Sequence, residues 1–479
     1  MSTAKASPKQ HNLLLITTDQ QRFDTINVAG CPWMRTPHLD WLCDQGIRFT
    51  RAYSDCPVCV PSRYSIMTGR HAFRQQTDFN PWNPSGFDRT RTLPALLSAA
   101  GYQTRAVGKM HFVPERDHLG FQHMELLPEY YREAARRGLH PMDSGLGQNE
   151  MAPAISTVHE NDSLTRWIAQ HSADFLDTRD TARPFFLWTS FSKPHPPFDP
   201  PMNYWQLYRD VAVPMPITGD WSREVESVPV GARRSSCVLN SVDHFSPDVL
   251  RDIRRAYYAL ITHVDYSLGH LFARLRELGL LETTTIIFTA DHGDMLGDHH
   301  LGAKTVHLEG SAHVPLIVRP APAFSTEDIG GTTCGTLACL TDLLPTFLSA
   351  AGLPVPTGID GRDLLADRRA GTSRDFLVGE YGEVLAVDDG RHRYHWFGEG
   401  GDELLFDLQA DPTESRDLIR AGTHREIQAR LRAVLRDHLV ATGNPLVVNG
   451  ELAPRPSRAL KRGEWPGFNT LTTANEVCH

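Results

Sequence analysis

The sequence lacks an excess of basic residues and lacks any long hydrophobic run. Its 479 residues carry 48 Lys and Arg against 57 Asp and Glu, a formal net charge of −9. General nucleic-acid binders usually carry a basic excess, so we expect no nucleic-acid partner. The apolar runs, such as 13–16 and 286–288, are a few residues long. A membrane-spanning helix needs about 20 apolar residues, so we also expect no membrane partner.

Residues 1–12 lack the apolar stretch of a secretory signal peptide, so the sequence predicts a cytoplasmic protein. There is no internal repeat and no low-complexity segment. The composition is 41% hydrophobic and 22% charged, which is typical of a globular chain and unlike that of a disordered one. The length allows about three domains, or one large α/β domain with an appendage.

The eight cysteines lack the spacing of a zinc ribbon. Cys56 and Cys59 form one C-x-x-C, but no second C-x-x-C or His/Cys pair follows at a suitable distance. In a reducing compartment most cysteines are small buried thiols. We therefore interpret seven of the eight as ordinary thiols and return to Cys59 below.

Buried strands and helices alternate over the first three quarters of the chain. Strands are predicted at 11–19, 103–107, 183–190 and 284–289, and helices at 37–46, 94–100 and 247–278. This alternation predicts an α/β fold with a large, mostly parallel, doubly wound sheet flanked by helices. In such sheets ligands bind beyond the carboxyl ends of the strands, so Asp19 and Asp291 are candidate site residues.

The C-terminal part has a different pattern. Short alternating segments at 376–380, 384–387, 393–396 and 403–406 precede a helical pattern at 424–440. We predict a catalytic domain over 1–370 and a smaller C-terminal subdomain with an antiparallel α+β sheet over 371–441. The tail, 442–479, is rich in Pro, Gly and Asn, and is either an arm that packs on a neighbouring subunit or a loosely ordered end. We expect a homo-oligomer, either a dimer or a tetramer.

Residues 59–63 read Cys-Val-Pro-Ser-Arg, and 68–70 read Thr-Gly-Arg. The pattern C-x-P-S-R followed by T-G-R resembles the signature of the type I sulfatases of the alkaline phosphatase superfamily, in which a dedicated enzyme oxidises the cysteine to formylglycine. Only Cys59 fits, because Cys56 has Val60 where the arginine should stand. A five-residue match also occurs by chance, in which case Cys59 is a structural thiol beside a turn.

Further segments fit the same family in the same order. They are Asp19-Gln20, Gly-Lys-Met-His at 108–111, Lys-Pro-His-Pro at 193–196, Ala-Asp-His-Gly-Asp at 290–294 with Leu-Gly-Asp-His at 296–299 and Lys304, and the segments 314–318 and 342–346. Several motifs in register are far more specific than one. The resemblance runs from about residue 13 to about residue 418, and it identifies the chain as a member of the sulfatase family.

The resemblance implies hydrolysis of sulfate monoesters at a metal-containing site. It assigns one divalent metal ion, Ca²⁺ or Mn²⁺ with Mg²⁺ as a further candidate, to Asp19, Gln20, Asp291, His292 and residue 59. Hard cations prefer oxygen ligands and polarise both a nucleophile and a sulfuryl oxygen, which suits these residue types. Formylglycine, derived from Cys59, would supply as its hydrate the hydroxyl that attacks sulfur.

The remaining roles are also implied by the resemblance. His111 would act as the base that releases sulfate, and Arg63 would orient residue 59 and the metal ligands. Lys109 and Lys304 would direct positive charge at the sulfate oxygens, and His195 would protonate the leaving oxygen with help from Lys304. Asn80 is a further candidate contact to sulfate.

Two departures from the family pattern leave alternatives open. Many sulfatases have Asp-Asn where this chain has Asp291-His292; the nitrogen ligand favours Mn²⁺ and also occurs in phosphonate monoester hydrolases and phosphodiesterases. Those enzymes resemble Tyr-x-Thr where this chain has Lys109 and His111. A second alternative, from another class, is a non-catalytic anion-binding relative with unmodified Cys59.

The expected substrate is a small aryl, alkyl or choline-like sulfate ester taken up by the cell. The expected protein partner is a formylglycine-generating enzyme. We expect the irregular segments 72–92, 113–160 and 200–245 to form the pocket walls.

Overall fold

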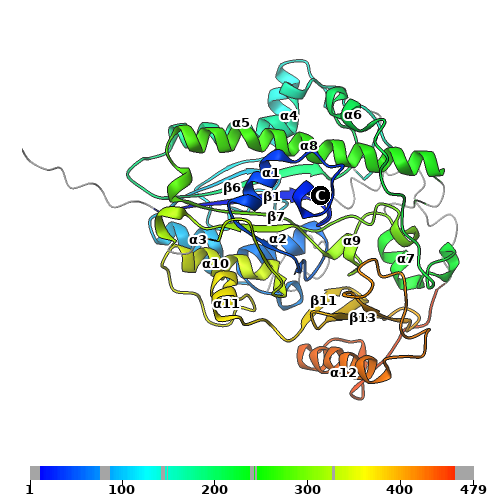
Figure 1. Ribbon diagram of the computed structural model, residues 1–479. Helices are drawn as coiled ribbons and strands as arrows, with labels where there is room; N and C mark the ends of the chain where they lie inside the picture. Colours follow the sequence, from blue (N-terminus) through cyan, green and yellow to red (C-terminus); the bar gives the residue numbers. More distant parts are fainter. Residues whose placement is uncertain are drawn as a thin grey trace, which may run out of the picture.

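The computed structural model describes residues 11–75, 87–141, 146–147, 149–237, 242, 245–325 and 329–458. Figure 1 shows a central sheet between two layers of helices, with a smaller sheet and its helix at one end of the molecule. The helix α8, Pro247–Glu277, lies across one face of the large sheet and is the longest described helix. This arrangement confirms the predicted α/β architecture.

The large sheet has eight described strands. In spatial order they are β5 (His123–Glu125), β4 (Gln103–Gly108), β6 (Phe185–Pro194), β1 (Asn12–Asp19), β7 (Thr284–Ala290), β8 (Leu316–Arg319), β2 (Ile47–Phe49) and β9 (Thr332–Cys334). Within this sheet, β8 is antiparallel to both of its neighbours, and the other pairs are parallel. The four strands β4, β6, β1 and β7 are adjacent and parallel, so their carboxyl ends lie at one edge of the sheet.

Strand β1 shows why the sequence reads as a continuous apolar run. Leu13 and Leu15 pack into a core on one face, and Leu14 and Ile16 pack into a second core on the other face. The first core is shared with α2 (Cys59–Thr68), α3 (Leu93–Ala99) and α10 (Leu343–Ala350), and the second with α1 (Pro37–Asp44), α5 (Leu164–Thr178) and α8. Both faces are therefore buried, as in doubly wound sheets.

The long helix α8 begins and ends at signals that are visible in the sequence. The Ser246 hydroxyl accepts a hydrogen bond from the Val249 amide at 3.4 Å, and Pro247 occupies the first turn. Arg274 and Arg276 lie in the last turn, where a positive charge interacts favourably with the helix dipole. The predicted bounds, 247–278, agree with this helix.

The remaining described elements are short and lie around the main layers. The helices are α4 (Leu127–Arg136), α6 (Met202–Tyr208), α7 (Val230–Cys237), α9 (Glu309–Ala312) and α11 (Leu364–Ala370). Strands β3 (Ala52–Tyr53) and β10 (Ala338–Cys339) pair in parallel beside the main sheet.

The smaller sheet is antiparallel and follows the chain order. Its strands are β11 (Leu377–Tyr381), β12 (Val384–Asp388), β13 (His392–Phe397) and β14 (Glu403–Asp407). Helix α12, Arg425–Thr442, buries Leu431, Leu435 and Leu439 against one face. Four strands and a closing helix were predicted here, and the structure confirms them; the domain boundary at residue 370 stays a prediction.

A buried ion-pair network joins the small sheet to the large part of the molecule. Arg393 of β13 contacts Asp388 at 2.6 Å and Glu309 of α9 at 2.7 Å. Burial alone would raise the pKa of the Glu309 carboxyl, but His313 and Arg393 lower it to about 2. The negative charge of Glu309, on α9, is thus stabilised in part by Arg393 of the small sheet.

The described part of the tail packs on its own chain. Strands β15 (Val447–Val448) and β16 (Glu451–Leu452) form a small hairpin, and Leu446 and Leu452 join the core beneath α12. Residues 459–479 lie outside the described residues, and the oligomerisation arm over 442–479 stays a prediction.

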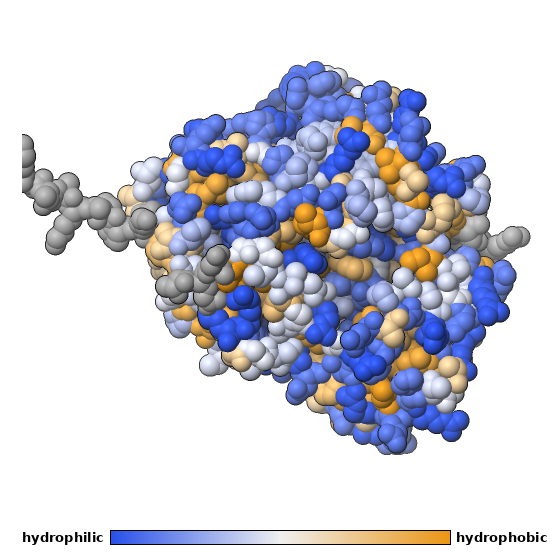
Figure 2. Space-filling view, in the orientation of Figure 1, coloured by the Kyte–Doolittle hydropathy of each residue, from blue (hydrophilic) through white to orange (hydrophobic). Residues whose placement is uncertain are grey.

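Among the described residues, every helix is too short or too polar to cross a membrane. In the face shown in Figure 2, hydrophobic residues form small patches separated by hydrophilic ones.

Candidate active site

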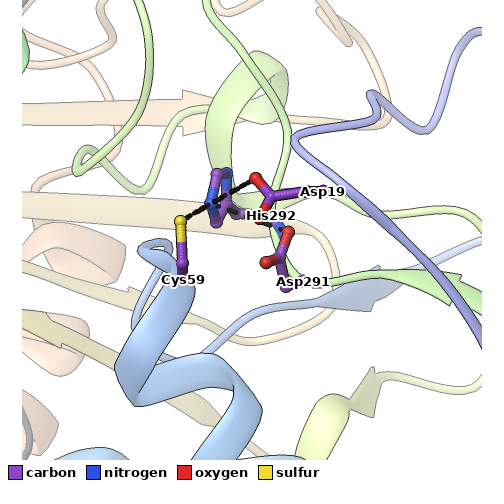
Figure 3. A group of neighbouring side chains, drawn as sticks. All are labelled: Asp19, Cys59, Asp291 and His292. Atoms are coloured by element: carbon purple, nitrogen blue, oxygen red, sulfur yellow. Dashed lines mark hydrogen bonds and ion pairs between the residues drawn. The ribbon is translucent and has the colours of Figure 1, made fainter. Parts of the chain in front are cut away.

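The predicted site residues converge at the carboxyl edge of the large sheet. Asp19 is the last residue of β1, Asp291 and His292 follow β7, and Cys59 is the first residue of α2. Figure 3 shows these four side chains facing one another. One ligand atom from each lies within 4.8 Å of the others, and all four residues are buried. The strand-end rule applied to the sequence therefore identifies the correct edge.

The thiol of Cys59 lies in the middle of this group. Its Sγ atom is 3.2 Å from Nε2 of His292 and 3.8 Å from Oδ1 of Asp19. The other ring nitrogen of His292, Nδ1, lies 2.9 Å from the carbonyl oxygen of Gly293. When Nδ1 donates to that carbonyl, Nε2 presents its lone pair to the cluster, as a metal-binding imidazole requires.

Arg63 stands one turn after Cys59 on α2 and contacts both carboxylates. Its Nη2 atom is 3.0 Å from Oδ2 of Asp19 and 2.8 Å from Oδ2 of Asp291, and its side chain has no exposed surface. Burial and the neighbouring Asp19 raise the pKa of Asp291. The guanidinium therefore compensates two buried negative charges at once, which explains why an arginine follows the cysteine by four residues.

Two lysines flank the thiol. Lys109, which follows β4, places Nζ 2.8 Å from Oδ2 of Asp19. Lys304, in a loop after β7, places Nζ 3.3 Å from Sγ of Cys59 and 2.8 Å from Oε1 of Gln20. Burial alone would raise the pKa of the Cys59 thiol, but Lys304, Lys109 and His292 hold it well below its usual range. The site thus stabilises negative charge at residue 59.

Two further histidines interact with the Cys59 side chain. His111 follows β4 and His195 follows β6, and both rings interact electrostatically with the thiol. Nδ1 of His195 also lies 2.9 Å from the carbonyl oxygen of Pro196. Burial, Lys109 and Lys304 lower the pKa of His195 to about 3. A sulfate anion between the two lysines would offset their charge and thereby favour protonation of His195.

Gln20 lies beside the carboxylates, but its side chain has partners of its own. Its Nε2 atom donates to Oδ2 of Asp294 at 2.5 Å, while its Oε1 atom accepts from Lys304. Its backbone amide donates to Oδ1 of Asp291 at 3.0 Å. Gln20 therefore connects the acidic cluster to Lys304, and its role as a metal ligand stays a prediction.

Unusual backbone conformations gather at this site. Among the non-glycine residues with positive φ angles, four lie here: Gln20 at 72°, His111 at 54°, Ala303 at 53° and Thr305 at 79°. Such conformations cost energy and cluster where a fold must present a side chain in a fixed direction. Here they lie at, or directly beside, residues predicted to bind metal, substrate or the nucleophile.

Gly108, the last residue of β4, lies close to β6 with a positive φ angle, and the chain then continues to Lys109 and His111. Its φ is +102°, and a Cβ atom at this position would lie 2.0 Å from the carbonyl oxygen of Ser190 on β6. A larger residue would therefore push β4 away from β6 just before the site.

A pocket of about 640 Å³ opens above Cys59. Its apolar wall includes Phe112, Leu127, Tyr130 and Tyr131. The segments 113–160 and 200–245 contribute to the walls as predicted, whereas the described residues of 72–92 do not line the pocket. Asn80, the further candidate contact to sulfate, lies outside the described residues.

Three residues that the sequence reasoning missed support the site. The hydroxyl of Ser190 accepts from Nη1 of Arg63 at 2.9 Å, and Asp294 holds Gln20. The hydroxyl of Tyr257 donates to the backbone oxygen of Gln20 at 2.6 Å. Tyr257 sits in the middle of α8, where an aromatic residue is usually core, so the sequence carries no signal for its role.

The donor set suits a divalent cation. Two carboxylates and one imidazole converge with residue 59, and Asp19 and Asp291 repel each other across the site. Oxygen ligands with one nitrogen are compatible with Ca²⁺, Mg²⁺ or Mn²⁺, and the nitrogen ligand favours Mn²⁺ among them. Asp19, Asp291 and His292 therefore fit the predicted metal-binding role.

Comparisons with known proteins agree with the geometry. The sequence model of the Sulfatase family matches residues 11–353. An arylsulfatase of Clostridium perfringens is 33% identical over 461 residues, covering 88% of this chain and 93% of that protein. A choline-sulfatase of Rhizobium meliloti is 29% identical, covering 88% of this chain and 85% of that protein. The crystal structure of a phosphonate monoester hydrolase of Agrobacterium radiobacter superposes with a TM-score of 0.77 at 23% identity, covering 91% of this chain and 96% of that one.

Proposed function

The chain belongs to the sulfatase family of the alkaline phosphatase superfamily and is a sulfuric ester hydrolase, and from this premise we propose that it cleaves small organic sulfate monoesters with a nucleophile made from Cys59. One observation carries the proposal. Cys59 begins α2 at the floor of the pocket, where Lys109, Lys304, His111 and His195 surround it. A sulfate group that reaches this thiol position enters a centre of positive charge.

Two groups beyond the unmodified chain complete the proposed chemistry. Formylglycine at position 59 would supply, as its hydrate, a hydroxyl nucleophile for sulfur. A divalent metal held by Asp19, Asp291 and His292, with Gln20 as the further predicted ligand, would polarise that nucleophile and neutralise sulfuryl oxygen charge. Arg63 keeps both carboxylates in place through the contacts described above.

The side chains around residue 59 then have separate roles. Lys109 and Lys304 hold the anionic oxygens of the sulfate group. The Nζ atom of Lys109 is positioned by Asp19 and that of Lys304 by Gln20. His111 takes a proton from the side chain of residue 59 to release sulfate. His195 gives a proton to the departing oxygen of the ester, once bound sulfate offsets the lysine charges that lower its pKa.

The pocket supports a small leaving group with an apolar part. Phe112, Tyr130 and Tyr131 line about 640 Å³, a volume that accommodates an aryl, alkyl or choline-like group. We propose a cytoplasmic enzyme that acts on an ester taken up by the cell and depends on a formylglycine-generating enzyme for maturation. An arylsulfatase and a choline-sulfatase among the relatives are consistent with this substrate class.

Hydrolysis of phosphonate monoesters or phosphodiesters is the second candidate. The Asp291-His292 pair favours it, and the fold is shared with a phosphonate monoester hydrolase. Lys109 and His111 favour the sulfatase activity, because both lie against residue 59 in place of the Tyr and Thr of the phosphonate hydrolases. The 33% identity to an arylsulfatase points the same way.

A substrate panel tests the proposal. The enzyme is produced together with a formylglycine-generating enzyme and stripped of metal. It is then assayed with and without added Mn²⁺ or Ca²⁺ on 4-nitrophenyl sulfate, a phosphonate monoester and a phosphodiester. We expect the sulfate ester to have the highest kcat/KM, and the added metal to restore it. Slower turnover of sulfate than of both phosphorus esters would overturn the assignment.

The mass of the peptide that contains residue 59 separates catalysis from simple anion binding. We expect an aldehyde in place of the thiol. A peptide that contains only thiol, from a sample that still turns over sulfate ester, would refute the proposed nucleophile. The same peptide from a sample without turnover would favour the non-catalytic alternative.

A further inference from the structure

A second group of metal-ligating side chains lies outside the active site. It consists of Asp55, His71 and Cys339, whose ligand atoms lie within 4.8 Å of one another. Asp55 precedes α2, His71 follows the Gly69 that ends α2, and Cys339 ends β10 far along the chain. The group therefore joins both ends of the helix that carries Cys59 to a distant strand.

The carboxylate of Asp55 is incompletely paired in a buried position. Its side chain is 2% exposed. Oδ2 accepts hydrogen bonds from Oγ of Ser65 at 3.2 Å and from the amide of Ala72 at 2.8 Å. Oδ1 has no hydrogen-bond partner among the described residues. A buried carboxylate oxygen without a partner is costly, and a bound cation would remove that cost.

The other two donors lie beside this carboxylate. Burial alone would lower the pKa of the His71 imidazole, but Asp55 and Cys339 raise it to about 10, so a metal ion that binds here displaces a proton from the imidazole. Nδ1 of His71 lies 3.3 Å from Oδ2 of Asp55, but the pair lacks hydrogen-bond geometry, and Nδ1 has no other hydrogen-bond partner among the described residues. Cys339 is a free thiol that is 1% exposed. Arg374, which is bound to Asp342, lies near enough to interact electrostatically with this thiol. A metal ion binds a cysteine through its thiolate sulfur.

We propose that Asp55, His71 and Cys339 form a second metal site, with Zn²⁺ as the ion it takes. One thiolate, one imidazole and one carboxylate make a donor set of the kind zinc accepts, and the fourth position would hold water. The active-site donors are mainly oxygen and suit a harder cation, so the two sites select different metals. Binding forms bonds from zinc to sulfur, nitrogen and oxygen, and two protons leave to solvent, one from the thiol of Cys339 and one from the imidazolium of His71.

The consequence of this site is structural. A metal ion here ties the loop before α2 and the segment after it to β10, so it would hold fixed the helix from which residue 59 and Arg63 enter the active site. It contributes no group to the reacting atoms. The inference rests on the second cluster alone and does not depend on the proposed substrate.

Cobalt substitution tests the site without interference from the active site. In a Cys59→Ala background, the active-site cluster has no thiol, so a thiolate-to-cobalt charge-transfer band must come from another cysteine. We expect one equivalent of Co²⁺ to produce this band, and an equimolar amount of Zn²⁺ to abolish it. Cys59→Ala/Cys339→Ser should lose the band. Cys59→Ala/Cys334→Ser, which removes a buried cysteine outside the cluster, should keep it.

A band that persists without Cys339, or no band in the Cys59→Ala protein, would overturn the proposal. Circular dichroism checks that each variant folds. If Cys339→Ser fails that check, Cys59→Ala/His71→Gln takes its place, because glutamine removes the ring nitrogens and keeps much of the volume of the His71 side chain, which is 15% exposed. We expect Zn²⁺ to raise the melting temperature of Cys59→Ala by more than that of Cys59→Ala/His71→Gln, in which only the active-site ligands remain. An equal rise in both proteins would also contradict the site.

Discussion

When each is replaced by Met, Lys109 and Lys304 should lose activity to a similar extent but stability to different extents. Both lie against residue 59, so each variant should lose transition-state stabilisation of the sulfate oxygens. Removal of one preorganised donor typically costs about 10²–10³ in kcat, or about 3–4 kcal/mol. The two variants should therefore have similar losses of activity.

Their stabilities should differ, because the two lysines have different partners. Lys109 contacts the buried carboxylate of Asp19 at 2.8 Å, whereas Lys304 contacts an amide oxygen and the thiol. Breaking a buried ion pair costs about 3–5 kcal/mol, and because Arg63 remains 3.0 Å from Asp19, we expect about 3 kcal/mol for Lys109→Met. Lys304→Met removes a buried charge that has no carboxylate within ion-pair distance among the described residues, so we expect a change within about 1 kcal/mol.

The assay combines kcat on 4-nitrophenyl sulfate with urea denaturation of metal-free protein, since a bound cation would mask the unpaired Asp19. Lys193 offers a matched control, because its ammonium is held by Asp199 at 2.6 Å. Lys193→Met should lose less than about tenfold in kcat. Equal destabilisation by Lys109→Met and Lys304→Met, or full kcat in either, would refute the assigned contacts.

Two further predictions concern the nucleophile and the small sheet. Cys59→Ala should abolish turnover and leave the melting temperature nearly unchanged, while Cys56→Ala, the neighbouring cysteine of the C-x-x-C, should keep turnover; substantial activity without Cys59 would mean that residue 59 is not the nucleophile. Burial and Arg393 lower the pKa of His395 to about 3, so its contribution to stability is present above pH 6.5 and is lost as the pH falls. His395→Leu should reduce the loss of unfolding free energy between pH 7 and pH 5 by about 2 kcal/mol, measured by urea denaturation, and an unchanged loss would contradict this.

Much of the fold follows from local pattern. The start of α8 was predictable because Ser246 and Pro247 mark it. Strand β1 was predictable because burial on both faces requires a continuous apolar run. The antiparallel direction of β8 was not predictable, since strand direction depends on how distant segments pair. The same reason separates the site residues: motifs identified Asp19, Cys59 and Lys304, whereas Tyr257 is brought there only by tertiary packing.

The sequence motifs identified residues of the site but not the hydrogen bonds between them. Gln20 and Asp294 both lie in motifs, yet their hydrogen bond, and the link through Gln20 to Lys304, appear only in the structure. Asp55, His71 and Cys339 are spread over almost 300 positions, so no spacing rule joins them. Long-range contacts of this kind carry no local sequence signal.

The ion pair between Arg393 and Glu309 limits how this protein can be divided or recombined. A version that stops at residue 370 would leave the carboxylate of Glu309 without Arg393. Loss of one partner of a buried pair costs about 3–5 kcal/mol, a large share of the stability of a typical protein. Glu309 lies five residues after Lys304, so the damage would reach the site itself. Grafts or fusions should therefore keep the small sheet together with the large one.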